Sequence, residues 1–465
     1  MFPGRDGTMI RRFIQSVFGK RAAKPAQVKV YARSEHGIAR EQLSPCALKV
    51  TETLSGAGYA AFVVGGAVRD LLLGRAPKDF DVATNATPEQ VRALFRRSRI
   101  IGRRFQIVHV MCGRETIEVT TFRASGNGAD EDERPTDAHG RILADNVFGT
   151  QAEDAARRDF TINALYYDPA REEVWDYHGG VADCRARVIR MIGDPATRYR
   201  EDPVRMLRAV RFAARLEFTV DRATRAPVAQ LAPLMVNVPR ARMFDEALKL
   251  LLSGHALRAL HQLRAEGLHH GLLPLLDAVL DDTAGERFIH AALANTDARI
   301  RADKPASPGF LFASLLWPQV LRRWQAAKEA GEHAMPALFA AADEALEAQR
   351  EALAIPRRFD GMIKEIWALQ PRFEPRGGQR PYRLLEHPRF RAGYDFLLLR
   401  AEAGEVAAEL ADWWTRFQDA DEAERAAMLV RDEASKPRRR RRRKKTSGAG
   451  AAEDAADIGT DSAVA

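Results

Sequence analysis

The sequence predicts an α/β domain that is followed by an all-helical remainder. Strand-like and helix-like segments alternate from about residue 43 to about residue 175, which is the pattern of an α/β unit. From about residue 176 the strand signal fades, and segments rich in Ala, Leu, Glu and Arg take over, as expected for helices. At 465 residues the chain is longer than one hydrophobic core usually supports, so we expect several domains.

The α/β part is expected to contain strands at 59–64, 106–112 and 115–122 and helices at 67–73 and 88–97. The second helix has Thr87 as a candidate cap and Pro88 in its first turn, where proline is tolerated. The last two strands are joined by a short Gly-Arg turn, which predicts a hairpin. Residues 123–150 are polar and Gly-rich, and a loop of this length is usually functional or disordered.

The helical remainder begins with candidate helices at 202–216 and 241–253 and continues through most of 256–428. We therefore divide the chain into five regions. These are a flexible basic leader (1–42), an α/β head (43–175), a helical neck (176–255), a helical body (256–430) and a disordered basic tail (431–465).

Composition is that of an ordinary globular protein, with 46% hydrophobic and 29% charged residues. The net charge of +9 is concentrated in residues 436–445, which read KPRRRRRRKK. Such a run repels itself and cannot be buried, so we expect it to be extended. It is either a solvated tail or an electrostatic arm for RNA or another anionic surface, and we favour RNA.

The three cysteines, Cys46, Cys112 and Cys184, are widely spaced and form no C-x-x-C motif. Their odd number argues against a disulfide framework and favours a reducing cytoplasm. No apolar run is long enough to predict a membrane span. Residues 9–21 are basic and weakly amphipathic but lack the apolar centre of a signal peptide, so a flexible leader is the favoured interpretation.

Two carboxylates, Asp79 and Asp81, form the most informative motif of the chain. If Phe80 lies in a strand, both side chains project to one face, where they repel each other unless a cation lies between them. Mg²⁺ prefers such oxygen ligands together with substrate phosphates. Just upstream, Gly65 and Gly66 separate a strand from a helix and could expose backbone N–H groups to a phosphate. Each signal alone is more often a turn or a cap; their order within about twenty residues favours nucleotide chemistry.

Four segments carry a family resemblance: GGAVRDLLLG with DFD, RRDFTINALYY, RARVIRMIGDP and REDPVRMLRAVRFAARL. Together they resemble the class II nucleotidyltransferases, the polymerase-beta-like group of CCA-adding enzymes and bacterial poly(A) polymerases. IGRRFQIVHV and RLLEHPRFRAGYDFLLLRAE are similar to the bacterial poly(A) polymerase branch. The similarity covers roughly residues 43–429.

The resemblance implies a polymerase-beta-like head with a mixed sheet, a neck that selects the base and a body that carries RNA. It implies template-independent transfer of AMP from ATP to RNA 3′-hydroxyl ends, with release of pyrophosphate and with two Mg²⁺ ions. We expect a cytoplasmic monomer whose partners are RNA 3′ ends and ATP. A link to RNA-decay proteins is implied, because tailing in the resembling enzymes marks RNA for decay.

The metal ligands are expected to be Asp79 and Asp81. A third carboxylate often completes such a site. Strand geometry points to Glu118, which alternates with Ile117 and Val119, whereas the resemblance points to Asp159. The sequence does not separate these two, and Glu118 could also be a plain exposed strand residue.

The remaining site residues follow from the resemblance. Nucleotide contacts are expected from the glycine pair already named and from Arg69, Arg158 and Asn163, with Arg157 a weaker candidate. Asp70 is expected either to orient Arg69 or to cap a local turn. Base selection is assigned to Asp202 and Arg205, which are three apart on a helix and share a face. Because Pro203 suits a first turn, Asp202 could instead be only a helix cap.

A basic stripe follows on the same helix at Arg208, Arg211 and Arg215. It could be a solvated face or an RNA contact, and we group it with the tail residues as candidate RNA ligands. Those tail residues are Arg438, Arg439, Arg440, Arg441, Arg442, Arg443, Lys444 and Lys445.

Two other functions fit the same residues. A CCA-adding tRNA nucleotidyltransferase would use the same active site, although the absence of any His-Asp dipeptide removes the subtype with an appended phosphohydrolase domain. A non-catalytic RNA-binding regulator would depend on the basic tail, but the intact Asp79 and Asp81 argue against it.

Overall fold

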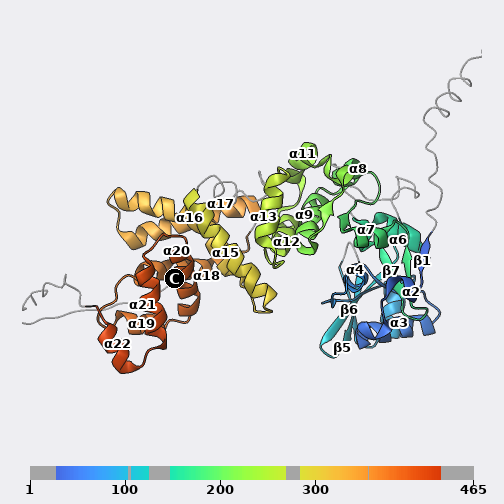
Figure 1. Ribbon diagram of the computed structural model, residues 1–465, viewed down its shortest axis with the longest axis horizontal. Helices are drawn as coiled ribbons and strands as arrows, with labels where there is room; N and C mark the ends of the chain where they lie inside the picture. Colours follow the sequence, from blue (N-terminus) through green and yellow to red (C-terminus); the bar gives the residue numbers. More distant parts are fainter. Residues whose placement is uncertain (1–27, 103–105, 125–146, 269–282, 354, 431–465) are drawn as a thin grey trace, which may run out of the picture.

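The computed structural model describes residues 28–102, 106–124, 147–268, 283–353 and 355–430. The molecule is elongated, with an α/β head at one end, a helical neck in the middle and a helical body at the other end (Figure 1). The predicted fold class is confirmed. The tail and most of the predicted leader and long loop lie outside the described residues.

The head is built on one mixed sheet of eight strands in the order β1-β8-β7-β2-β3-β6-β5-β4. The pairing of β3 with β6 is parallel, and the other neighbours are antiparallel. The strands are β1 (Lys29–Tyr31), β2 (Ala61–Val64), β3 (Asp81–Thr84), β4 (Ser98–Ile101), β5 (Ile107–Cys112), β6 (Glu115–Thr121), β7 (Leu165–Asp168) and β8 (Glu173–Asp176).

The predicted hairpin is confirmed as β5 and β6, and Thr87 caps its helix by accepting a hydrogen bond from the Gln90 backbone. Two boundaries were wrong. The helix predicted at 88–97 ends at Leu94, since the following residues form edge strand β4. The leader predicted at 1–42 extends too far, because β1 pairs with β8 and adds an edge strand to the sheet.

Helices cover one face of the sheet, and on the other face strands β4 to β6 carry mostly exposed side chains within the described residues. Helices α3 and α5 pack on the side where Val108, Val110, Ile117 and Val119 are buried. Alternation along β6 therefore leaves Glu118 on the opposite side. The helices of the head are α2 (Arg33–His36), α3 (Pro45–Gly56), α4 (Gly66–Leu72), α5 (Pro88–Leu94), α6 (Gln151–Arg157) and α7 (Gly180–Ala186), with 3-10 turns η1 (Arg40–Gln42) and η3 (Thr161–Asn163).

The cysteines correct one expectation. Cys46 at the start of α3 and Cys112 at the end of β5 form a disulfide, although they are 66 residues apart, and Cys184 is free and buried. An odd count therefore did not exclude a bridge. The fold decides this pairing, because packing of α3 on the sheet brings the two Cα atoms to 5.9 Å.

The neck comprises α8 (Pro195–Glu201), α9 (Val204–Leu216), α10 (Arg222–Arg225), α11 (Val228–Leu231), η4 (Ala232–Asn237), α12 (Arg240–Leu251) and α13 (Ala256–Ala265). The neck was predicted at 176–255, so α7, which is grouped with the head, falls inside that range and α13 falls outside it. The helix predicted at 202–216 starts two residues later. A short parallel pair, β9 (Val188–Ile189) and β10 (Thr219–Val220), joins the end of the head to the neck.

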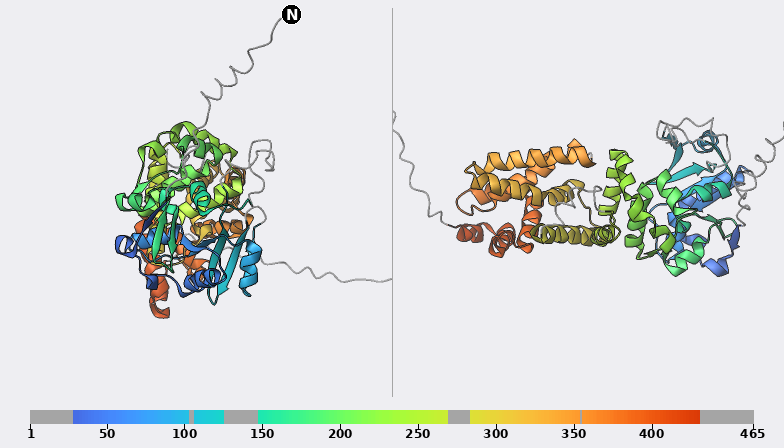
Figure 2. Two further views of the ribbon diagram at one scale, coloured as in Figure 1. Left: turned by 90° about the vertical axis from the view of Figure 1, so that its right-hand side faces the viewer. Right: turned by 90° about the horizontal axis from the view of Figure 1, so that it is seen from above.

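The body is confirmed as helical, and its long helices α15, α16 and α17 run along the long axis of the molecule (Figure 2). Aromatic side chains including Phe373, Trp413, Trp414 and Phe417 form a separate core at its far end. The elements are α15 (Thr283–Arg301), α16 (Pro308–Glu329), α17 (Ala334–Leu353), η5 (Arg357–Phe359), α18 (Asp360–Leu369), η6 (Gln370–Arg372), α19 (Arg380–Leu385), α20 (Phe390–Glu402), α21 (Ala408–Asp419) and α22 (Glu422–Met428). None of the described helices is both long and apolar enough to cross a bilayer.

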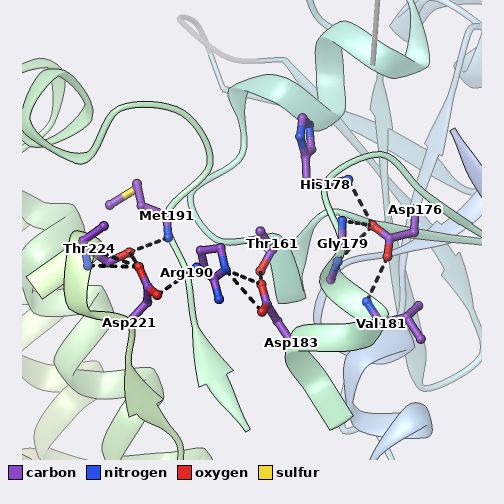
Figure 3. A network of polar contacts seen from close by, with 12 residues as sticks. Thr161, Asp176, His178, Gly179, Val181, Asp183, Arg190, Met191, Asp221 and Thr224 are labelled. Atoms are coloured by element: carbon purple, nitrogen blue, oxygen red, sulfur yellow. Dashed lines mark hydrogen bonds and ion pairs between the residues drawn. The ribbon is translucent and has the colours of Figure 1, made fainter. Parts of the chain in front are cut away.

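A polar network fastens the neck to the head (Figure 3). The Arg190 guanidinium donates to Asp183 of α7 at 3.1 Å and to Asp221 of the neck at 2.8 Å. Asp183 also accepts a hydrogen bond from Thr161. Asp176, at the end of β8, accepts four backbone N–H groups at the start of α7, which fixes this helix against the sheet.

Gly180 at the start of α7 offers a test of this packing. A Cβ there would lie 2.2 Å from the Thr161 carbonyl oxygen, a backbone atom that cannot move aside. We expect Gly180→Ala to lower the free energy of unfolding by about 3 kcal/mol. Thermal or urea denaturation of the full chain measures this effect. Gly56→Ala is the matched control, because a Cβ at Gly56 meets nothing within 4 Å; equal stability of the two variants would contradict the packing described.

Candidate active site

Asp79 and Asp81 lie at the start of β3, on either side of the buried Phe80. Phe80 precedes the strand, so the condition of the prediction is not met; Asp79 is exposed, Asp81 is half-buried, and the negative charge of Asp79 acts on Asp81. Parallel pairing of β3 with β6 sets Asp81 directly opposite Glu118. Residues paired in this way point to the same face of a sheet.

The pKa of Asp81 reflects the proximity of the other carboxylates. Burial raises the pKa of Asp81 to about 6, the negative charges of Glu118 and Asp79 contribute to the rise, and Arg158 counteracts them. Asp81 therefore lies within electrostatic reach of two other carboxylates, and Arg158 offsets them only in part. Perturbation of this kind is typical of functional sites.

Among the described residues, no three His, Cys, Asp or Glu side chains converge closely enough to hold a metal ion by themselves. Mg²⁺ does not require that, because it commonly takes one or two protein carboxylates and completes its shell with water and substrate phosphates. The crowded carboxylate oxygens of Asp79, Asp81 and Glu118 are the donor type that such an ion takes.

Asp159 is a poorer third ligand than Glu118, because both of its oxygens are already engaged. One accepts hydrogen bonds from the Phe160 backbone at 2.7 Å and from the Asn163 amide at 3.1 Å. The other pairs with Arg208 at 2.6 Å. Burial by itself would raise the pKa of Asp159, but the Arg208 charge and these hydrogen bonds outweigh it and lower the pKa.

The glycine pair occupies the predicted place between β2 and α4. Gly65 has a φ of +69°, a conformation that favours glycine. Its N–H is not free, because it donates to the Leu165 carbonyl at 3.0 Å. Only the first-turn N–H groups of α4, starting at Gly66, are left without helical partners.

Arg69 lies inside the protein, only 3% exposed. It donates to Asp70 at 2.8 Å and to the Asn163 side chain at 2.7 Å. The expected orienting role of Asp70 is confirmed by this contact. In this arrangement Arg69 positions Asn163, and through it Asp159, so a direct contact of Arg69 with phosphate gains no support from the geometry.

Arg158 is the arginine near the carboxylates, since its charge counteracts the raised pKa of Asp81. It pairs with Asp154 at 3.1 Å and also donates to the Tyr166 hydroxyl and the Asn163 carbonyl. Burial by itself would lower the pKa of Arg158, but the charges of Tyr166 and Asp154 and their hydrogen bonds outweigh it and raise the pKa. Sequence reasoning missed Asp154 and Tyr166, because neither lies in a motif that signals chemistry by itself.

Asp202 and Arg205 lie at the junction of α8 and α9, but their side chains have different partners. One Asp202 oxygen accepts from Arg242 of α12 at 2.6 Å, and the other is buried without a partner. Arg205 pairs with Glu201 at 3.0 Å. Asp202 is not the N-cap of α9, whose N-cap is Pro203 without a side-chain cap, but it stands at the C-cap of α8.

The basic stripe on α9 is only partly exposed, and its three arginines lie against carboxylates of the protein. Arg208 and Arg211 both reach Glu246 of α12, Arg208 also binds Asp159, and Arg215 lies 4.0 Å from Asp70. The stripe therefore joins the neck to the head. The expectation that these arginines bind RNA finds no support in these contacts, because each one faces a carboxylate of the protein itself.

Comparison with known proteins agrees with this geometry. The chain is 45% identical over 446 residues to a poly(A) polymerase I of Salmonella typhi, covering 93% of this chain and 96% of that one. The chain belongs to the bacterial poly(A) polymerase family. Family models match it at 61–190 (poly A polymerase head domain), 217–280 (probable RNA and SrmB-binding site of polymerase A) and 330–446 (polymerase A arginine-rich C-terminus).

CCA-adding enzymes are more distantly similar to this chain. One from Lactobacillus helveticus is 39% identical over 215 residues, which is 46% of this chain and 51% of that enzyme. Among solved structures, the CCA-adding enzyme of Bacillus stearothermophilus in complex with CTP has a TM-score of 0.55 and 28% identity, covering 80% of this chain and 82% of that one. The sequence likeness to this CCA-adding enzyme covers about half of the chain, whereas the likeness to poly(A) polymerases covers nearly all of it.

The raised pKa of Asp81 predicts a dependence of stability on pH in divalent-free buffer. Between about pH 4 and pH 6 the native state alone keeps the proton, so the contribution of Asp81 to stability is lost as pH rises through about 6. We expect Asp81→Asn to raise Tm relative to the original chain at pH 8, and to raise it less at pH 4. Asp245→Asn, at an exposed position of α12, is the control and should change Tm little at either pH. A lower Tm for Asp81→Asn at pH 8 would contradict the described crowding.

Proposed function

We infer that the chain transfers AMP from ATP to RNA 3′-hydroxyl ends without a template and releases pyrophosphate. The observation that carries this inference is the pairing of Asp81 with Glu118 next to Asp79, at the open side of a head that belongs to the poly(A) polymerase family. RNA and ATP are the substrates that this family membership supports.

Asp79, Asp81 and Glu118 are the residues that would hold Mg²⁺, and we propose two ions. Bound there, the ions would supply charge stabilisation for the attacking hydroxyl and for the pyrophosphate. The charge of Arg158 reaches Asp81, but Asp154 already pairs with this arginine, so the expected contact of Arg158 with the phosphates stays a prediction. Asp159 and Asn163 are held in a fixed orientation by Arg208 and Arg69, which suits contacts to the sugar of the nucleotide.

We propose that Asp202 and Arg205 contact the base, as expected from the motif. The unpaired oxygen of Asp202 can accept a hydrogen bond from an exocyclic amino group, such as that of adenine. Arg242 holds the other oxygen and so fixes the orientation of the carboxylate. An amino group is also present on cytosine, so base choice requires a direct test.

The decisive experiment offers ATP alone or CTP alone with two RNAs, a tRNA lacking its 3′ terminus and an unrelated oligoribonucleotide. We expect AMP chains on both RNAs and little CMP addition. Asp79→Ala and Asp81→Ala should each lower AMP transfer by about 100- to 1,000-fold, as for loss of a group that stabilises transition-state charge. Efficient CMP addition to the tRNA without long A-tails on the other RNA would favour a CCA-adding enzyme. Full activity of both variants would refute the carboxylate site.

The basic tail, which lies outside the described residues, is proposed as an RNA-binding arm. Deleting 436–445 should weaken RNA binding and flatten its salt dependence, by about 0.7 in the log–log slope for each RNA phosphate that the run neutralises. Deleting 446–465, which lacks the basic run, is the matched control. RNA titrations at several salt concentrations measure the slope, and an unchanged slope in the first deletion would mean that the run does not bind RNA. Whether the product is passed to RNA-decay proteins, and whether the chain acts as a cytoplasmic monomer, stay predictions.

A further inference from the structure

In the described part of the chain, three strands of the head carry mostly exposed side chains on one face, and we call this the open face. It consists of the alternate residues Arg99 and Ile101 of β4, His109 and Met111 of β5, and Thr116 and Glu118 of β6. The helices α3 and α5 pack against the other side of these strands. Figure 1 shows β5 and β6 at the margin of the head, and β4 forms the edge of the sheet beside them.

The strand register places four polar side chains in one row across the open face. Asp81 is paired with Glu118, Glu118 with His109, and His109 with Arg99. Directly paired residues share a face, and neighbouring strands are about 4.8 Å apart, so the row spans roughly 14 Å between its end residues. It begins at the proposed metal ligands and ends at a cation on the sheet edge.

Arg99 differs from the arginines of the active site in that no carboxylate of the described residues pairs with it. Arg69, Arg158 and Arg208 are each held by aspartates. Arg99 is exposed, and within the described part of the chain no ion pair or side-chain hydrogen bond engages its guanidinium. Its neighbour in the row, His109, is instead drawn to Glu118, with 3.4 Å between Nε2 and Oε1. Arg99 is therefore a cation available to an external anion.

The same face carries exposed apolar surface on both sides of the row. Ile101 is 41% exposed and Met111 is 43% exposed. Large apolar side chains that project from a sheet beside a cation suit a single-stranded nucleic acid, since its bases have apolar faces and its backbone is anionic. A phosphate chain is repelled from the carboxylate end of the row and attracted to the Arg99 end, which orients a strand along it.

We propose that the open face binds the last nucleotides at the 3′ end of the RNA primer. The terminal 3′-hydroxyl lies at the carboxylate end, Arg99 binds a phosphodiester that precedes it, and Ile101 and Met111 contact bases. This proposal rests on the proposed function for the identity of the RNA, and adds where on the head its 3′ end lies.

Photo-crosslinking tests the position directly. An oligoribonucleotide with 4-thiouridine at its second or third position from the 3′ end is bound to the full chain without ATP, irradiated, and mapped by peptide mass spectrometry. We expect crosslinks to residues 98–112, and fewer when the label is moved ten nucleotides upstream. Crosslinks confined to the neck or body would overturn the proposal. If the chain transferred no AMP to RNA, the proposed function would fail, while the crosslinks would still report where RNA lies.

Charge reversal tests the role of Arg99. We expect Arg99→Glu to raise KM for RNA about tenfold, to leave KM for ATP unchanged, and to lower the salt slope of RNA binding by about 0.7. Arg92→Glu is the matched control, because Arg92 is also exposed but lies on α5, which covers the opposite face. An Arg99→Glu variant that matched this control would overturn the proposal. So would light scattering that showed a dimer disrupted in Arg99→Glu but not in Arg92→Glu, since β4 would then pair with a second copy instead of RNA.

Discussion

The buried charge of Asp159 is the constraint on which the arrangement of head and neck depends. A carboxylate that has left water must be paired and hydrogen-bonded, or it costs several kcal/mol. Asp159 meets this requirement with Asn163 from the head and Arg208 from α9 of the neck. Arg69 in turn holds Asn163. Correct placement of the neck is therefore needed to satisfy a charge in the head, which couples the region beside the carboxylates to the helix that follows Asp202.

The carboxylates at β3 and β6, unlike Asp159, are not fully paired with basic side chains among the described residues. Asp81 and Glu118 are placed side by side by a parallel pairing, and no lysine or arginine neutralises them fully. The fold thus pairs the buried charge of Asp159 within itself, whereas the half-buried Asp81 lies beside the exposed Asp79 and Glu118. An uncompensated cluster costs stability in the free protein and is the part of the head that a cation and a triphosphate can stabilise.

The motif residues were predictable from the chain because local spacing determines them. The spacing around Phe80 keeps the two aspartates close to each other, and Thr87 with Pro88 fixed the start of α5. The hairpin of β5 and β6 was predictable because both strands alternate in polarity and a tight turn joins them. In contrast, β1 and β4 were missed, since short edge strands gain their stability from a neighbour that is distant in sequence or from residues that also favour helix.

The arginines show where prediction from sequence fails. Their charge was plain, but the direction of each side chain depends on which carboxylate another element brings near. Arg69 turned inward to Asp70 and Asn163, and Arg208 and Arg211 turned to Asp159 and Glu246. Arg242 is 40 residues from Asp202 in the chain, and no local pattern could have joined them. The disulfide between Cys46 and Cys112 was unforeseen for the same reason.

The sequence by itself determined the division into an α/β head and a helical remainder, the family, and the two aspartates on which the proposed chemistry rests. These depend on periodicity and on residues close together in the chain. Only the tertiary structure decided that Glu118 rather than Asp159 lies beside Asp81. It also decided which arginines pair with carboxylates of the protein and that Arg99 is exposed on the open face. Those outcomes depend on strand order and helix packing, because contacts between distant segments set the charge balance of a buried site.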